Sequence, residues 1–184
     1  MTGTHGRRPA RGFSLLELMI VVGITLVVAA IAIPGVLIAT QNFKLRSTAS
    51  SFSGLVQKCR MLAVARNTPN PVIPSSGGFT CTVNSTENKD ILLPPNIVAD
   101  TTAGGLSPSS MNMAWTSTAV VAPPAFNARG LPCIVSGGAC TVTGQGYIYY
   151  LRQDRALGAT GWAAVTVTPA GRAQVWTWDG SQWE

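Results

Sequence analysis

The chain has 184 residues, of which 46% are apolar and only 11% are charged, so it fits one small domain plus a lipid-spanning segment and excludes a disordered protein. Half of its net charge of +6 comes from three arginines among the first twelve residues, so the basicity belongs mainly to the N-terminal end. The one histidine, His5, lies there too, which removes most histidine-dependent catalysis and metal binding from the rest of the chain. We expect neither an enzyme nor a bound metal or cofactor.

A basic stretch, residues 1–12, precedes an apolar run from Phe13 to Phe43 that contains one acid, Glu17. About 20 apolar residues cross a bilayer as a helix, so residues 13–43 predict a transmembrane helix. The preceding arginines should stay in the cytoplasm, which places the remainder of the chain on the opposite side of the membrane. Because the run is longer than the apolar part of a secretory signal and continues into an amphipathic segment, we expect a retained anchor.

Glu17 is costly at the edge of such a span unless it is paired or lies among lipid headgroups, and both alternatives are open on physical grounds. Residues 12–22, GFSLLELMIVV, resemble the prepilin signal of type IV pilins and type II secretion pseudopilins, with the glutamate five residues after the glycine. The resemblance implies that prepilin peptidase cuts between Gly12 and Phe13, that the new amine of Phe13 is N-methylated, and that Glu17 pairs with the N-terminal amine of a neighbouring subunit. It also implies that Pro34 bends or locally melts the helix.

The segment that follows the span shows the period of an amphipathic helix with one packed face. We predict one helix from about residue 14 to residue 66, whose second half, within 44–68, packs under a globular head. Pro69 and Pro71 should end it, because proline cannot continue a helix. The apolar positions that recur at three- and four-residue steps are Phe52, Leu55, Val56, Cys59, Leu62 and Ala63.

Residues 69–184 are predicted to form a β-rich head, with stretches 94–110 and 117–132 as loops. The last two strands alternate in polarity and are joined by residues 169–172, which predicts a terminal hairpin. The predicted strands are 79–83, 91–93, 111–116, 146–151, 163–168 and 173–178.

Three further segments resemble the GspH/FimT branch of minor pilins and pseudopilins: the Ala65–Arg66 pair, residues 126–132 (FNARGLP) and residues 167–172 (VTPAGR). This resemblance implies an α+β fold in which a long N-terminal helical spine packs against a C-terminal antiparallel β head of two small sheets. It also implies a subunit held in the inner membrane with its head on the extracytoplasmic side. There it meets prepilin peptidase/N-methyltransferase and other pilin subunits, and it enters a type IV pilus or a type II secretion pseudopilus in priming or at the tip.

Four cysteines lie beyond the span, in a compartment where disulfides form, and four cysteines allow three pairings. A short loop with two glycines favours Cys133 with Cys140, which leaves Cys59 for Cys81. A buried free thiol at Cys59 is the alternative.

Arginines and aromatic residues accompany each other in the last third of the chain, as in proteins that bind nucleic-acid backbones and stack on bases. Some FimT-like proteins bind DNA through a Gly-Arg-x-Arg pattern in the terminal hairpin, but here Gly171-Arg172 is followed by alanine and glutamine. Candidate DNA contacts are Arg172, Arg152 and Arg155. The alternative is that the aromatics form sheet core, that Arg152 and Arg155 flank a turn, and that Arg172 caps the hairpin. Besides a pilin-like structural subunit and a DNA-binding receptor, a third hypothesis is an unrelated membrane-anchored β domain. Failure of prepilin peptidase to process the leader would favour it.

Overall fold

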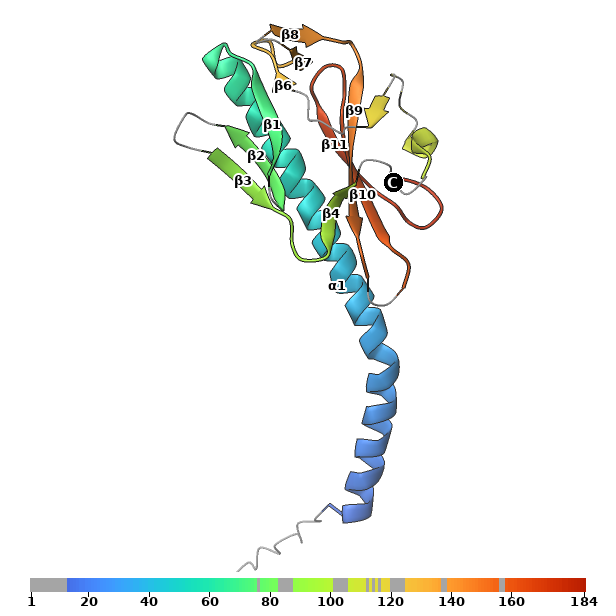
Figure 1. The fold of residues 1–184 in the computed structure, drawn as a ribbon. Coiled ribbons are helices and arrows are strands. Elements are labelled where there is room, and N and C mark those ends of the chain that lie inside the picture. The colour runs from blue at the N-terminus through green and yellow to red at the C-terminus, as the bar shows by residue number, and fades with distance from the viewer. Residues whose placement is uncertain are drawn as a thin grey trace, which may run out of the picture. The chain divides into compact units, whose positions relative to one another are not determined.

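The computed structural model (Figure 1) describes residues 13–75, 77–82, 88–100, 106–111, 113, 115, 117–119, 125–136, 139–155 and 158–184. The chain divides into two compact units, Met1–Ala39 and Thr40–Glu184. The leader, including Gly12, lies outside the described residues.

One helix, α1 (Leu15–Arg66), confirms the predicted long helix and differs from it by one residue at the start. Its first backbone hydrogen bond runs from the Leu18 N–H to the Ser14 carbonyl at 3.1 Å, so Ser14 takes the N-cap position and Glu17 lies in the first turn. A serine followed three residues later by glutamate is the capping-box pattern. Asn67, with a φ of 55°, follows the last helical residue in a left-handed conformation that ends helices.

The first sheet has six strands in the order β3-β2-β1-β6-β7-β8, and all of its pairings are antiparallel. β1 contains Pro71 and Pro74. Its first two residues pair with β6 and its last four with β2, so each half has one neighbour and an open side where a missing N–H is tolerated. The strands are β1 (Asn70–Ser75), β2 (Gly78–Thr82), β3 (Asn88–Leu92), β6 (Ala125–Phe126), β7 (Pro132–Ser136) and β8 (Ala139–Val142).

The second sheet has the antiparallel order β11-β10-β9-β4, and the short strand β5 (Ser117–Ala119) adds one parallel pairing to β9. β10 and β11 form the predicted terminal hairpin, with Val167 opposite Ala173. The strands of the main path are β4 (Ile97–Asp100), β9 (Gly146–Gln153), β10 (Gly161–Val167) and β11 (Ala173–Thr177).

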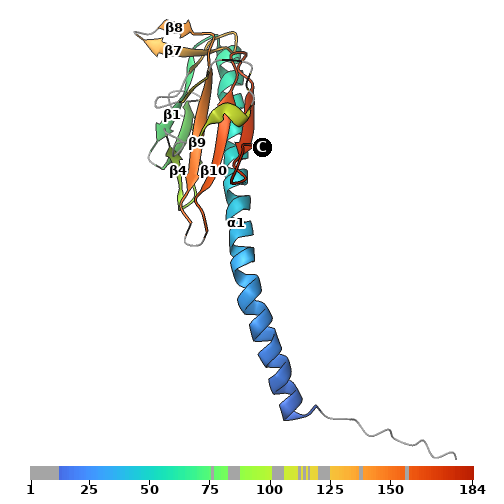
Figure 2. The same ribbon diagram turned by 90° about the vertical axis from the view of Figure 1, so that its right-hand side faces the viewer.

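Both sheets pack against the part of α1 that lies in the second unit, as Figures 1 and 2 show. Phe52 is fully buried where the three layers meet, with its ring centroid 4.1 Å from that of Phe79 on β2 and 5.0 Å from that of Tyr149 on β9. Alternate residues of β9, such as Ile148 and Tyr150, pack on the other face of the second sheet with Trp183. The α+β architecture with a helical spine and two sheets is therefore as predicted, with β5 as the parallel exception.

Two secondary-structure predictions were wrong. The strand expected at 111–116 is absent from the described residues of that stretch, where a 3₁₀ helix, Pro108–Met111, precedes β5. The stretches taken as loops, 94–110 and 117–132, contain β4, β5, β6 and the first residue of β7. These strands have two to five residues, which is too short for a visible alternation of polarity.

Candidate functional site

The apolar part of α1 exposes its side chains all round. Within the described residues, one 18-residue window of α1 has a mean hydropathy of 2.7 with none of it buried, so the helix is long and apolar enough to cross a membrane. Phe13 is 70% exposed, and no described residue forms an ion pair with Glu17. An uncovered apolar surface of this size requires lipid or other helices around it.

Pro34 lies inside α1, and the helix is continuous there. The bend or local melting that the prepilin resemblance implies at Pro34 stays a prediction. Proline has no N–H, so the Ala30 carbonyl lacks its usual helical donor.

Two turns in the head share one geometry, and we name Asn127–Leu131 and Thr168–Arg172 the paired turns. In each, the first N–H donates to the fifth carbonyl (3.0 and 2.9 Å), and the N–H of a glycine in the fourth position donates to the first carbonyl (2.8 Å in both). The first side chain also accepts from the fifth N–H, at 2.9 Å on Asn127 Oδ1 and 3.1 Å on Thr168 Oγ1. A three-residue hairpin loop with glycine in the left-handed position has this form.

The paired turns contact each other and the same stretch of α1. Gln57 Nε2 donates to the Gly171 carbonyl at 3.4 Å, and Arg60 Nε donates to the Gly130 carbonyl at 3.0 Å. Gly130 and Gly171 have φ values of 74° and 80°, and a Cβ on Gly171 would collide with the Gly130 carbonyl oxygen. The structure thus brings together the two head segments that carried the GspH/FimT resemblance, and both segments accept hydrogen bonds from α1.

The candidate DNA-binding arginines do not form one surface. Arg152 forms ion pairs with Asp100 at 3.1 Å and with Asp154 at 3.2 Å. Arg155 donates a hydrogen bond to Asn42 Oδ1, and burial lowers the pKa of its guanidinium. Each of these two arginines thus has a partner within the second unit, and the pairing of Arg152 with Asp154 fits the alternative in which the two flank a turn, whereas the bond from Arg155 to Asn42 on α1 was not anticipated.

Arg172 is exposed, but it lies near the end of β10, whereas Arg152 on β9 lies beside the start of β10. Arg152 pairs with Trp162 near the start of β10, whereas Arg172 precedes the residue that pairs with Val167. Five residues of strand separate these positions, which is about 17 Å. Arg129, which is also exposed, belongs to the turn that contacts the turn of Arg172, and Arg60 of α1 lies against the glycines of both turns.

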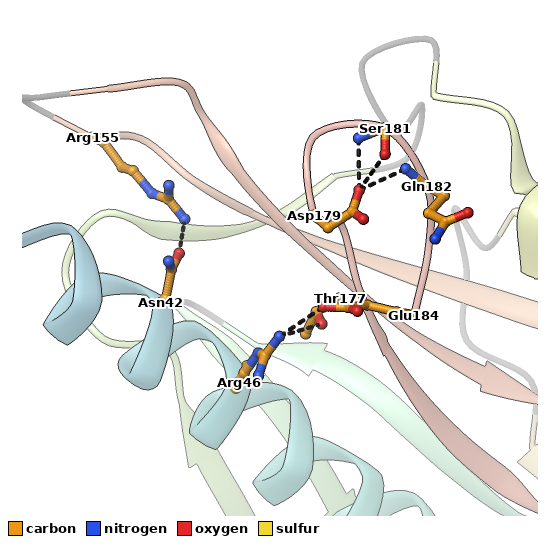
Figure 3. A network of polar contacts seen from close by, with 8 residues as sticks. All are labelled: Asn42, Arg46, Arg155, Thr177, Asp179, Ser181, Gln182 and Glu184. Atoms are coloured by element: carbon orange, nitrogen blue, oxygen red, sulfur yellow. Dashed lines mark hydrogen bonds and ion pairs between the residues drawn. The ribbon is translucent and has the colours of Figure 1, made fainter.

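A second polar network lies where α1 enters the head (Figure 3). Arg46 Nη2 donates to Glu184 Oε1 at 3.1 Å and to Thr177 Oγ1 at 3.2 Å, and Asn42 accepts from Arg155 one helical turn earlier. Asp179 Oδ1 accepts from the N–H of Gln182 and from the N–H and hydroxyl of Ser181, at 2.7, 2.7 and 2.9 Å. These bonds, that from Gln182 first, lower the pKa of the Asp179 carboxyl below its ordinary value.

The cysteines lie in two pairs, Cys59–Cys81 and Cys133–Cys140, with Cα–Cα distances of 5.7 and 5.4 Å that suit disulfides. These are the pairs preferred from the sequence. The first joins α1 to β2, and the second joins β7 to β8. Peptide mapping without reduction is the chemical test of this pairing.

Comparison with known proteins bears on the N-terminal part alone. Residues 7–33 match the family model described as the prokaryotic N-terminal methylation motif, which is the type IV pilin leader. No curated protein and no solved structure matches the chain. The motif supports a type IV pilin-like precursor and indicates a structural subunit rather than an enzyme. It implies processing by a prepilin peptidase and assembly with other pilins, and together with the apolar helix it suggests membrane anchoring.

Sequence reasoning missed the residues that hold the paired turns and the Asn42–Arg46 network. One signal was available: an asparagine or threonine three residues before a glycine is typical of a turn, and both paired turns have it. Nothing in the sequence linked either turn to Gln57 or Arg60, because those contacts span 70 and 114 residues.

Proposed function

We propose that the chain is a minor pilin or pseudopilin that is inserted in the inner membrane with its head on the extracytoplasmic side. It is processed after Gly12, methylated on Phe13 and assembled through its apolar helix into a type IV pilus or a type II secretion pseudopilus. The observation that carries the proposal is the uncovered apolar helix whose first part lies within the methylation motif. The head seated on the same helix supplies a surface for neighbouring subunits.

A position in priming or at the tip is the finer part of this proposal. It is supported by the paired turns, which join the two head segments that resemble the GspH/FimT branch. Quantifying the subunit against the major subunit in sheared filaments tests it, because a tip subunit is expected at a few copies per filament.

Glu17 is proposed to pair with the N-terminal amine of a neighbouring subunit, since a carboxylate in an apolar bundle needs a cationic partner. Glu17→Ala should leave the head folded and reduce entry into filaments. The matched control is Thr25→Ala, which removes a polar group from the same exposed helix without changing charge. Equal filament entry by the two variants would remove the role assigned to Glu17.

Processing is tested by mass spectrometry of the full chain expressed with a prepilin peptidase. The expected product begins at a methylated Phe13. A chain that keeps residues 1–12 would instead favour an unrelated membrane-anchored β domain.

A DNA receptor at a pilus tip is the second candidate, and the exposure of Arg129 and Arg172 on adjacent turns is the observation that favours it. It predicts sequence-independent DNA binding by the detergent-solubilised full chain, weakening as salt rises. Arg172→Ala and Arg129→Ala should each reduce binding, whereas Arg152→Ala, which changes an ion-paired arginine, should have little effect. Absence of binding at low salt would leave the structural subunit alone.

A further inference from the structure

A cavity of about 430 Å³ with both polar and apolar lining lies in the second unit beside the Asn42–Arg46 stretch of α1. One wall is helical, the second consists of Arg155 and residues 159–162, and the third consists of residues 177–180 together with Leu106. Its principal lining residues are Asn42, Arg46, Arg155, Trp162, Trp178 and Asp179.

The helical wall of this cavity begins at Asn42, at the C-terminal end of the apolar run Phe13–Phe43 in the sequence. Lys44 and Arg46 are the first basic residues after the apolar run. If residues 13–43 span the bilayer, as the proposed function requires, this wall lies at the level of the lipid headgroups.

The cavity offers cationic groups for a phosphate. Arg155 Nε is buried without an acceptor, so the guanidinium has unused hydrogen-bonding capacity. Gly161 makes room for it, because a Cβ there would collide with that guanidinium. Arg46 is paired with Glu184, but both side chains are more than half exposed, and an exposed pair is weak enough for a phosphate to compete.

The same cavity offers groups for an amine and for the interfacial layer. Asp179 is ionised at neutral pH, since hydrogen bonds within its own turn favour the charged carboxylate. Trp162 and Trp178 are half-buried, and tryptophan is enriched at membrane interfaces. Two guanidiniums with one carboxylate complement a headgroup that carries both a phosphodiester and a primary amine.

We propose that this cavity binds the phosphoethanolamine headgroup of a membrane phospholipid while the subunit resides in the bilayer. Arg155 and Arg46 contact the phosphate, and Asp179 contacts the amine. The contact holds the base of the head at the membrane surface before assembly.

The test is native mass spectrometry of the full chain released from detergent micelles doped with phosphatidylethanolamine, phosphatidylcholine or phosphatidylglycerol. Retained phosphatidylethanolamine in clear excess over the other two lipids is the expected result. Arg155→Gln and Arg46→Gln should each weaken retention about tenfold, as loss of one charged hydrogen bond does. Asp179→Asn should remove the preference for the ethanolamine headgroup over choline.

The matched control is Arg172→Gln, the same charge change at the far end of β10, which should leave lipid retention unchanged. Soluble glycerophosphoethanolamine, added as competitor, separates headgroup recognition from acyl-chain binding and should displace the lipid. Equal retention by the Arg46, Arg155 and Arg172 variants, or no preference among the three lipids, would overturn the proposal. Leader processing is measured separately, so loss of lipid binding with normal processing rejects the cavity alone.

Discussion

Replacing Gly171 by alanine is expected to destabilise the head strongly, and Gly144 provides the matched control. Both glycines lie in turns with positive φ, 80° and 69°, so alanine costs each position about 1 kcal/mol of backbone strain. A Cβ at Gly144 meets nothing within 4 Å, whereas one at Gly171 collides with the Gly130 carbonyl oxygen. The paired turns must then separate, which weakens the carbonyl contacts of Gln57 and Arg60.

Those two hydrogen bonds contribute about 1 kcal/mol each. Gly171→Ala should therefore lower the free energy of unfolding by about 3 kcal/mol, and Gly144→Ala by about 1 kcal/mol. Urea unfolding of the detergent-solubilised full chain, followed by tryptophan fluorescence, reports on the head because all five tryptophans lie in the second unit. Equal losses for the two variants would refute the tight contact between the turns.

Three other predictions concern the stability of the head, two of them measured by the same urea unfolding and one by thermal unfolding as a function of pH. Phe52→Ala should cost about 3 to 5 kcal/mol because it empties the junction of α1 with both sheets, while Phe43→Ala, at a 74% exposed position, should change little. Burial, then the charge of Tyr147, raises the pKa of the Tyr149 phenol well above 10.0. The contribution of the neutral Tyr149 to folding stability is therefore complete below pH 10 and is lost as the pH rises further. Tyr149→Phe should keep the stability at pH 7, since the buried hydroxyl has no partner, and it should reduce the fall in melting temperature at alkaline pH. Loss of the Cys59–Cys81 bridge, which spans 22 residues, should cost about 3 kcal/mol, against about 2 kcal/mol for the bridge between β7 and β8, which spans 7. A flat alkaline profile in the wild-type chain, or equal costs for the two bridges, would contradict the last two expectations.

The helix and the terminal hairpin could be predicted because their signals are local. α1 has an apolar run, a packed-face period and prolines that end it, and residues 169–172 separate two alternating strands. β1 was missed because Pro71 and Pro74 argue against a strand, and only the division of its two halves between β6 and β2 makes them acceptable.

The arginines show why side-chain roles were harder to predict than the fold. Sequence proximity grouped Arg152 and Arg155 with Arg172, but β10 separates them along its length. Asp100, which comes 52 residues before Arg152, accepts a hydrogen bond from the Arg152 guanidinium. Such long-range partners depend on sheet register, which no local pattern in this chain specifies.

The seating of the paired turns on α1 also has a mechanical consequence. Gln57 and Arg60 are three residues apart, yet one holds a turn of the second sheet and the other a turn of the first. If the chain is drawn out of a bilayer by its helix, as the proposed function requires, the pulling force reaches the head through α1. Because Gln57 and Arg60 bond turns of different sheets, we expect that force to act on both sheets at once.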